Sequence, residues 1–326
     1  MKKVIIALTL VLSVLTIQAC DDNNGGGSER VTLSCGDVLT TSVVTSDAAT
    51  SRNLVVTDDV LNCSGTAVTV VGPESLDLNG HTVSCDGSAG SIGIMLSGEG
   101  ATVKNGTVTN CETGIYAGDD GMHTIRDMLA VDNIGSKEIL LNGGIVVDSD
   151  NNTLRNVTVT GNNPVGMVLY GNGNEVRDCD VSENLHSGLA ILSNSNEVSD
   201  CVVNDNNYVN LSMVSVIENE LTDRGNNNKV TRVTANRNNS HDGIYVGGDF
   251  NMISESQADE NEVSGIEISA AGTDNTVFNN SAFNNNQSVQ SGDDRGGTDL
   301  AQQDPDNCDN TWLGNLFGTS NSECIE

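Results

Sequence analysis

Two histidines and a tyrosine stand at related places in the C-terminal half of the chain. His186 lies in the segment NLHSGL and His241 in NSHDGI, and the segment between them carries Tyr208. Asp242 follows His241 directly. Histidine, tyrosine and a carboxylate can together supply a base and a proton donor near neutral pH. We therefore predict His186, Tyr208, His241 and Asp242 as a catalytic group. The alternative interpretation is that these are ordinary surface residues at turns.

The other three tyrosines follow glycines that open alternating segments, at positions expected to point outward. They are Tyr116, Tyr170 and Tyr245. Flat rings spaced along a ribbon can stack on sugar rings while their hydroxyls form hydrogen bonds. This pattern predicts a substrate-binding face. The alternative is that tyrosines decorate an exposed sheet, because aromatic residues favour strands.

Three arginines, Arg126, Arg155 and Arg177, lie at the same position of consecutive segments and should stack at strand spacing. Like charges in a column repel, so these arginines require anions. The anions could be uronate or sulfate groups of a polymer, which would make the arginines substrate-binding. They could equally be the nearby acids Asp127, Glu175, Asp178 and Asp180, and the acidity of the chain favours this local pairing.

Carboxylates are sparse at the expected outward positions of the glycine-initiated segments. The candidates are Asp148 and Glu267, which are several segments apart. Glycosidases use two carboxyl groups at a defined separation. We therefore expect no such pair on neighbouring outward positions.

A repeat of about 22 residues positions all of these groups. Six segments open on an Asn, have an aliphatic residue two positions later and carry a second Asn ten positions after the first. The opening residues are Asn152, Asn174, Asn196, Asn228, Asn251 and Asn275, and the second ones are Asn162, Asn184, Asn206, Asn238, Asn261 and Asn285. A glycine and an alternating strand follow, as at Gly166, Gly188, Gly243 and Gly265. Short alternating strands without helical stretches predict an all-β parallel solenoid.

Asparagine suits the recurring columns for two reasons. It tolerates left-handed backbone geometry, which turns require. Its side-chain amides, stacked at about 4.8 Å, can also form hydrogen bonds along the solenoid axis. We therefore expect a ladder of asparagine amides in which the opening residues also form the turns.

These columns resemble the right-handed parallel β-helix repeats of polysaccharide lyases of the pectate-lyase type, of alginate epimerases and of the β-helical protein of nitrous oxide reductase maturation. The resemblance covers roughly residues 76–285 and implies a right-handed parallel β-helix with end caps. It indicates function weakly, because this fold also carries hydrolases, adhesins and non-catalytic proteins. His241 and Asp242 resemble the end of the Asp-Pro-His-Asp motif of alginate epimerases, whose histidine abstracts the sugar proton. Asn239 and Ser240 replace its Asp-Pro half.

Eight cysteines besides Cys20 form an even set, which in an exported protein indicates disulfides. Cys179 and Cys201 share one column of adjacent segments, and Cys85 and Cys111 share another, at a spacing that fits a disulfide. Cys35 with Cys63 and Cys308 with Cys324 would close the two ends. The alternative for the column cysteines is a buried free thiol.

The N-terminus has the pattern of an export signal. Lys2 and Lys3 precede an apolar run, and the residues Ile17-Gln18-Ala19-Cys20 resemble a bacterial lipobox. This pattern predicts a signal peptide over residues 1–19, lipidation of Cys20 and a flexible tether over residues 20–30. We expect an N-terminal cap and first coil over residues 31–75, β-helix repeats over 76–289, and a C-terminal loop and cap over 290–326. The predicted location is the bacterial cell envelope.

The charge of -31 excludes a surface that follows nucleic acid phosphates. Nothing in the sequence indicates a metal site or a cofactor, although acidic loops such as AGDDG from Ala117 are compatible with loosely bound calcium. We predict an envelope-anchored monomer that recognises an extended polymer, in the first place a polysaccharide. A polysaccharide lyase or uronate C5-epimerase is the alternative, and a structural or adhesive surface protein is the third interpretation.

Overall fold

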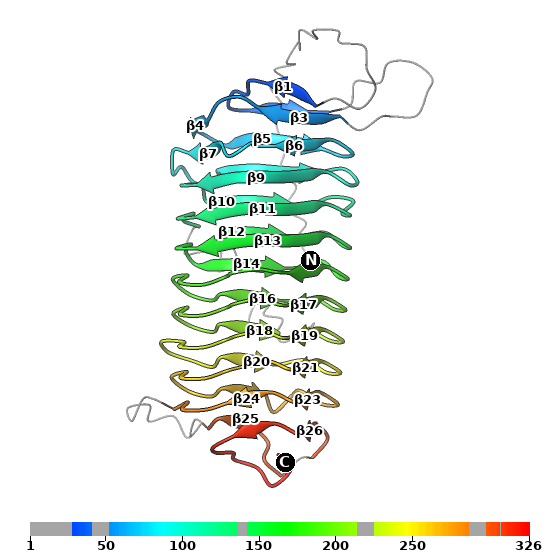
Figure 1. Ribbon diagram of the computed structural model, residues 1–326, viewed down its shortest axis with the longest axis vertical. Coiled ribbons are helices and arrows are strands. Elements are labelled where there is room, and N and C mark those ends of the chain that lie inside the picture. Colours follow the sequence, from blue (N-terminus) through cyan, green and yellow to red (C-terminus); the bar gives the residue numbers. More distant parts are fainter. Residues whose placement is uncertain (1–27, 41–51, 136–141, 214–224, 287–297, 307) are drawn as a thin grey trace, which may run out of the picture.

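A computed structural model describes residues 28–40, 52–135, 142–213, 225–286, 298–306 and 308–326. These residues form strands and turns, and they wind into a parallel β-helix of stacked coils (Figure 1). The prediction of an all-β solenoid is therefore confirmed.

Two long parallel sheets run along the axis. Sheet 1 has 14 strands. In spatial order they are β1 (Glu29–Val31), β3 (Asn53–Val56), β6 (Ser75–Asp77), β9 (Thr102–Thr109), β11 (Thr124–Val131), β13 (Thr153–Thr160), β15 (Glu175–Arg177), β17 (Glu197–Ser199), β19 (Lys229–Thr231), β21 (Met252–Ser254), β23 (Thr276–Phe278) and β26 (Thr311–Leu313), with β4 (Val60–Cys63) and β7 (Thr82–Cys85) beside this path.

Sheet 2 has 11 strands. They are β2 (Asp37–Leu39), β5 (Thr66–Val71), β8 (Ile92–Ser97), β10 (Thr113–Ala117), β12 (Gly143–Val147), β14 (Val165–Leu169), β16 (Leu189–Ile191), β18 (Leu211–Met213), β20 (Ile244–Val246), β22 (Ile266–Ile268) and β25 (Leu300–Gln302). A short third sheet pairs β24 (Ser281–Ala282) with β27 (Leu316–Phe317). Isolated parallel bridges continue its line through earlier coils.

The interior is a continuous column of aliphatic side chains between the sheets. In sheet 2 the first and third residues after the glycine point inward, and Leu189 and Ile191 are fully buried. A Leu or Ile side chain buried in this way contributes about 1.5–3 kcal/mol relative to an exposed one. Period-two alternation along each strand therefore explains the core, as the sequence predicted.

The opening asparagines form a hydrogen-bonded ladder along the coils. The Oδ1 atom of each one accepts the backbone N–H of its counterpart one coil earlier, at 2.8–2.9 Å. The members are Asn152, Asn174, Asn196, Asn228, Asn251, Asn275 and Asn310. His123 takes the same place at the N-terminal end, where its backbone N–H donates to Asn152 Oδ1 at 2.8 Å.

The expectation that the ladder asparagines themselves adopt left-handed geometry is wrong. The left-handed residue is instead the one directly before each of them. Before the six opening asparagines these residues are Asn151, Gly173, Ser195, Asn227, Phe250 and Asp274, with φ between 55° and 66°. A ladder amide must point into the coil, so the sharp turn falls on the preceding residue.

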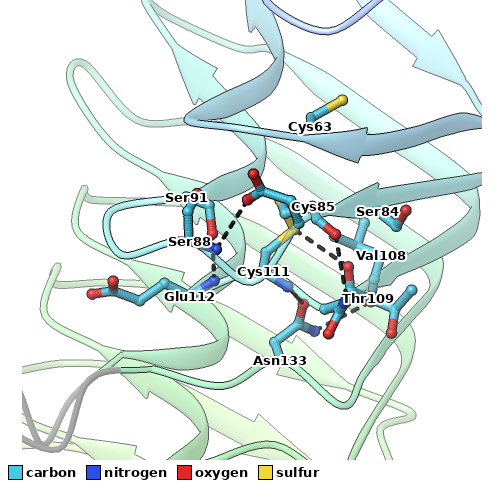
Figure 2. The surroundings of a disulfide bond; sticks show 12 residues. Cys63, Ser84, Cys85, Ser88, Ser91, Val108, Thr109, Cys111, Glu112 and Asn133 are labelled. Atoms are coloured by element: carbon cyan, nitrogen blue, oxygen red, sulfur yellow. Dashed lines mark hydrogen bonds between the residues drawn. A yellow bond between two sulfur atoms is a disulfide. The ribbon is translucent and has the colours of Figure 1, made fainter.

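A second ladder starts at Asn133, beside a disulfide. Figure 2 shows the bond between Cys85 and Cys111 and, next to it, the side chain of Asn133. The Oδ1 atom of Asn133 accepts the backbone N–H of Cys111 at 3.1 Å. Asn162, Asn184 and Asn206 continue this ladder one coil at a time.

All four predicted disulfide pairings are confirmed. Cys35 pairs with Cys63 and Cys308 with Cys324 at the two ends, whereas Cys85–Cys111 and Cys179–Cys201 join neighbouring coils. The Cα atoms of the two inner pairs lie 4.8 Å and 4.5 Å apart, which is the spacing of one coil.

The parallel register already begins at β1, before residue 76, and it continues through β26 to the C-terminal end.

Candidate functional site

Three rings stack at the corner that leads into sheet 2, and we call His186, Tyr208 and His241 the ring stack. The ring centroids of His186 and Tyr208 are 4.5 Å apart with the planes 29° from parallel, and those of Tyr208 and His241 are 4.8 Å apart. The backbone N–H of Tyr208 donates to the carbonyl of His186 at 2.8 Å. Ring spacing thus follows coil spacing, and the three residues predicted from separate segments lie side by side.

The ring stack is open to solvent at its centre. Tyr208 is 42% exposed, whereas His186 and His241 are half-buried. Burial lowers the pKa of His186, which favours a neutral ring. The ring of Tyr245 meets that of His241 edge-on, with centroids 6.1 Å apart. The predicted substrate-binding Tyr245 therefore adjoins the predicted catalytic group.

Two buried carboxylates lie beneath His241. Nδ1 of His241 lies 2.7 Å from Oδ2 of Asp242, a contact that is an ion pair when the ring is protonated. Oδ1 of Asp242 accepts the backbone N–H of Ser264 at 2.9 Å. Asp242 is fully buried, so its charge must be balanced within the protein.

Glu267 is the second carboxylate, and it lies one coil from Tyr245 in the same register. Its Oε2 atom accepts the Ser264 hydroxyl at 3.0 Å, and its Oε1 atom accepts Gln303 Nε2 at 2.6 Å. Burial, reinforced by the charge of Asp242, raises the pKa of Glu267 above its ordinary value. Perturbed carboxyl groups of this kind are frequent in functional sites.

The sequence analysis considered only Asp148 and Glu267 as outward carboxylates, so it missed the pair formed by Asp242 and Glu267. Asp242 lies just before β20 rather than at an outward position of it, so the search of outward positions passed over it. The sequence signal that could have identified Asp242 is the HDG segment, because an acid directly before the glycine faces the outward residue one coil later. Because Asp242 is not an outward position of β20, the expectation that neighbouring outward positions carry no glycosidase-type carboxylate pair stays a prediction.

Tyr116 and Tyr170 lie farther toward the N-terminal end of the same outer face. The Tyr116 hydroxyl donates to Oδ2 of Asp148 at 2.6 Å, and burial together with this bond raises the pKa of Tyr116. Burial also raises the pKa of Tyr170, which is 36% exposed. The structure does not bring these tyrosines to the ring stack. The outward residues of β12, β14 and β16 on this face, Val146, Val168 and Ala190, are nevertheless buried, and Tyr116 packs against their cluster.

The predicted arginine column exists but lies on sheet 1. Arg126, Arg155 and Arg177 are register partners on β11, β13 and β15. They pair with the nearby acids Asp127, Asp178 and Glu175 at 2.6, 3.1 and 2.9 Å, respectively. A surface hollow of about 610 Å³ lies over Arg126 and Arg155. Because the arginines and the ring stack lie on different sheets, they do not form one site.

Comparison with known proteins identifies the architecture. A family model described as "right handed beta helix region" matches residues 90–231 and, in an overlapping second match, residues 143–304. A comparison of the sequence with curated proteins found no match.

Several solved structures share the fold at low sequence identity. The A-module of the Azotobacter vinelandii mannuronan C-5 epimerase AlgE6 superposes with a TM-score of 0.58 and 13% identity, covering 91% of this chain and 87% of that module. The AlgE4 A-module from the same organism gives 0.53 and 12%, with 91% and 88% coverage. The Dettilon tailspike protein gives 0.51 and 15%, and the match covers 90% of this chain but only 58% of the tailspike.

Two further observations concern the described residues alone. They include no helix with the length and hydrophobicity of a membrane span. They also contain no group of three or more His, Cys, Asp or Glu side chains arranged to hold a metal ion. The predicted lipidation residue, Cys20, lies outside the described residues.

Proposed function

Because the chain belongs to the right-handed β-helix family, we propose that it uses the outer side of this β-helix to recognise an extended polysaccharide at the ring stack. The observation that carries the proposal is the alignment of three rings on consecutive coils at 4.5 and 4.8 Å. Rings stacked in such a row cover one another's faces and offer a line of ring edges to an extended chain, and the hydroxyl and imidazole groups there offer hydrogen bonds.

The similar structures share only the fold with this chain. They therefore support a general class of ligand and not a particular one. The two epimerase modules act, by name, on mannuronan, which is a long polysaccharide. Their identity to this chain is 13% and 12%, so they do not specify a substrate here. The Tyr116 and Tyr170 region would extend the same face, and the arginine hollow on sheet 1 would be a separate contact.

A catalytic function is the second candidate, and the group formed by His241, Asp242 and Glu267 favours it. A lyase acting on a uronate polymer must remove the proton beside the carboxylate, break the bond to the departing oxygen and protonate that oxygen. A C5-epimerase must remove the same proton and return one from the opposite side. His241 beside Asp242 is suited to be the base, and Tyr245 or a protonated Glu267 is suited to donate.

Binding measurements on purified protein test both candidates. Calorimetric titration with uronate, sulfated and neutral polysaccharides should reveal at least one ligand, and Tyr208→Ala should weaken that binding about tenfold through lost ring contact. Phe250→Ala is the matched control, because Phe250 is an exposed aromatic residue outside the ring stack. Its affinity should equal that of the wild type. Equal affinities in all three proteins would contradict a role for the ring stack.

Turnover separates recognition from catalysis. If the protein is a lyase or epimerase, His241→Ala should lower the rate by about 10² to 10⁴ while binding persists, since a general base contributes mainly to the transition state. Ultraviolet absorbance detects the unsaturated product of a lyase, and NMR of the polymer detects epimerised residues. If the wild type binds but does not transform any polymer, recognition alone stands. If it neither binds nor transforms any of them, a structural or adhesive role is favoured.

A further inference from the structure

The second asparagine ladder has a regular unit that recurs from coil to coil. At Asn184 the backbone N–H donates to Asn206 Oδ1 at 2.9 Å, and Nδ2 donates to the same oxygen at 3.1 Å and to the carbonyl of Val159 at 3.0 Å. Asn162 and Asn261 repeat this arrangement with their own neighbours. Each amide thus satisfies the backbone of the coil before it.

The ladder changes partner immediately after Asn206. The sequence repeat predicts that Asn206 pairs with Asn238 of the next coil. Instead, the backbone N–H and Nδ2 of Asn206 donate to Oδ1 of Asn210, at 3.1 and 3.0 Å. Nδ2 of Asn210 then donates to the carbonyl of Asn236 at 2.9 Å and to Asn261 Oδ1 at 3.3 Å. Asn210 therefore replaces the side chain of Asn238 in the ladder, whereas the backbone N–H of Asn238 still donates to Asn261 Oδ1 at 2.9 Å.

The reason is the position that Asn210 occupies. It aligns with Gly188 and Gly243, because Leu211 pairs with Leu189 on one side and Ile244 on the other. At Gly188 an added Cβ would lie 2.5 Å from Asn206 Nδ2, so glycine leaves room for the ladder amide. In the coil of β18 this glycine is replaced by Asn210, whose own amide fills that room and displaces the side chain of Asn238. Asp299 holds the same position in the coil of β25, where its Oδ1 atom accepts the backbone N–H and Nδ2 of Asn285 at 3.1 and 3.0 Å.

The displaced amide of Asn238 acts on its own turn. Its Oδ1 atom accepts the backbone N–H of Ser240 at 2.9 Å and that of His241 at 2.6 Å. Asn238 is 3% exposed, so these bonds are shielded from water. They fix the turn that brings the His241 ring against Tyr208 and over Asp242.

We propose that Asn210 and Asn238 are positioning residues for His241, and that the exchange of ladder partner at Asn210 exists to present this histidine in the ring stack. The proposal rests on the proposed function, because that function gives the ring stack its role. The position of the His241 ring can nevertheless be measured without any ligand. The proposal predicts that the second ladder and the turn at His241 compete for the side-chain amide of Asn238. Removing the Asn210 side chain should return Asn238 to the ladder.

The decisive variant is Asn210→Gly, with Asn238→Ala as its counterpart and Asn162→Ala as the control. NMR of protein with ¹³C-labelled histidine, assigned through His241→Gln, reports the His241 ring directly. Asn210→Gly and Asn238→Ala should both shift the His241 resonance. Asn162→Ala removes a ladder amide three coils away from His241. It should lower the Tm but leave the His241 resonance and the affinity unchanged.

Two results would overturn the proposal. One is an unchanged His241 resonance in either Asn210→Gly or Asn238→Ala. The other is a shift of equal size in Asn162→Ala, which would show a general loss of structure. If the wild type binds no polysaccharide, the proposed function fails, whereas the resonances still decide whether Asn210 and Asn238 position His241.

Discussion

At the scale of single residues, Glu267 lies where an acidic side chain is costly. It points to the outer side of β22 but is only 3% exposed, and it faces the buried Asp242. A folded-state pKa above the unfolded value means that the native state binds the extra proton. This contribution to stability is present at low pH and is lost as the pH rises through the folded pKa. Above the folded pKa, the ionised Glu267 therefore weakens the fold.

Glu267→Gln should consequently stabilise the protein. The amide oxygen can still accept the Ser264 hydroxyl, and no charge is buried beside Asp242. We expect a gain of about 0.5–2 kcal/mol in the free energy of unfolding at pH 7.5, and a smaller gain near pH 5. Urea denaturation at the two pH values measures both. A loss of stability at pH 7.5 would show that the ionised carboxylate is favourable in the fold.

Glu197→Gln is the matched control for this charge change. Glu197 pairs with Lys229 at 2.7 Å on the exposed side of sheet 1. Exposed ion pairs contribute about 0–1 kcal/mol, so this variant should not gain stability. A buried acid that costs stability is expected in a functional site, because selection for folding alone would replace it.

At the scale of elements, the first asparagine ladder depends on its N-terminal end. There His123 is fully buried, accepts the backbone N–H of Ala101 through Nδ1 at 3.2 Å and donates through Nε2 to the carbonyl of Gly118 at 2.7 Å. Both contacts require the neutral ring. Burial lowers the pKa of His123 accordingly. The unfolded chain then binds more protons below the ordinary histidine pKa of about 6.5, so stability is lost as the pH falls below that value.

His123→Asn should reduce this sensitivity to acid. Asparagine is the residue of the same column in the following coils, so it can accept the Ala101 N–H without a titrating group. We expect the Tm to fall between pH 7.5 and pH 5.5 in the wild type and to fall less in the variant, as measured by circular dichroism. His81→Gln, at an exposed ion pair with Asp59, is the control. An equal acid response in the wild type and His123→Asn would contradict the role of His123.

The sequence predicted the parts of these elements that repeat. A period of about 22 residues places Cys179 and Cys201, or Arg155 and Arg177, one coil apart, and both juxtapositions are confirmed. Alternation predicts which way a side chain points but not what covers it, so the burial of Glu267 was missed. The exchange at Asn210 was also missed, because a repeat predicts the usual partner and not an exception.

At the scale of the whole molecule, the ring stack is far from the N-terminal cap. Seven steps of sheet 2 separate β2 from β18, which at about 4.8 Å per step corresponds to about 34 Å. The disulfides Cys35–Cys63 and Cys308–Cys324 close the two ends of this stack. A protein held by its N-terminal end would therefore present the ring stack well away from its attachment point.

The anchor that we propose for this end is a lipid on Cys20, as the sequence pattern indicates. Cys20→Ser should abolish lipid attachment and move the protein from the membrane fraction to the soluble fraction of the host cell, because a signal peptide and a polar tether supply no other stable anchor. Immunoblots of separated fractions and the intact mass of the purified protein measure the two effects. Polysaccharide affinity should not change, because the tether contributes nothing to the ring stack. Undiminished membrane association of the unlipidated variant would show that the β-helix itself, rather than a lipid, holds the protein at the envelope.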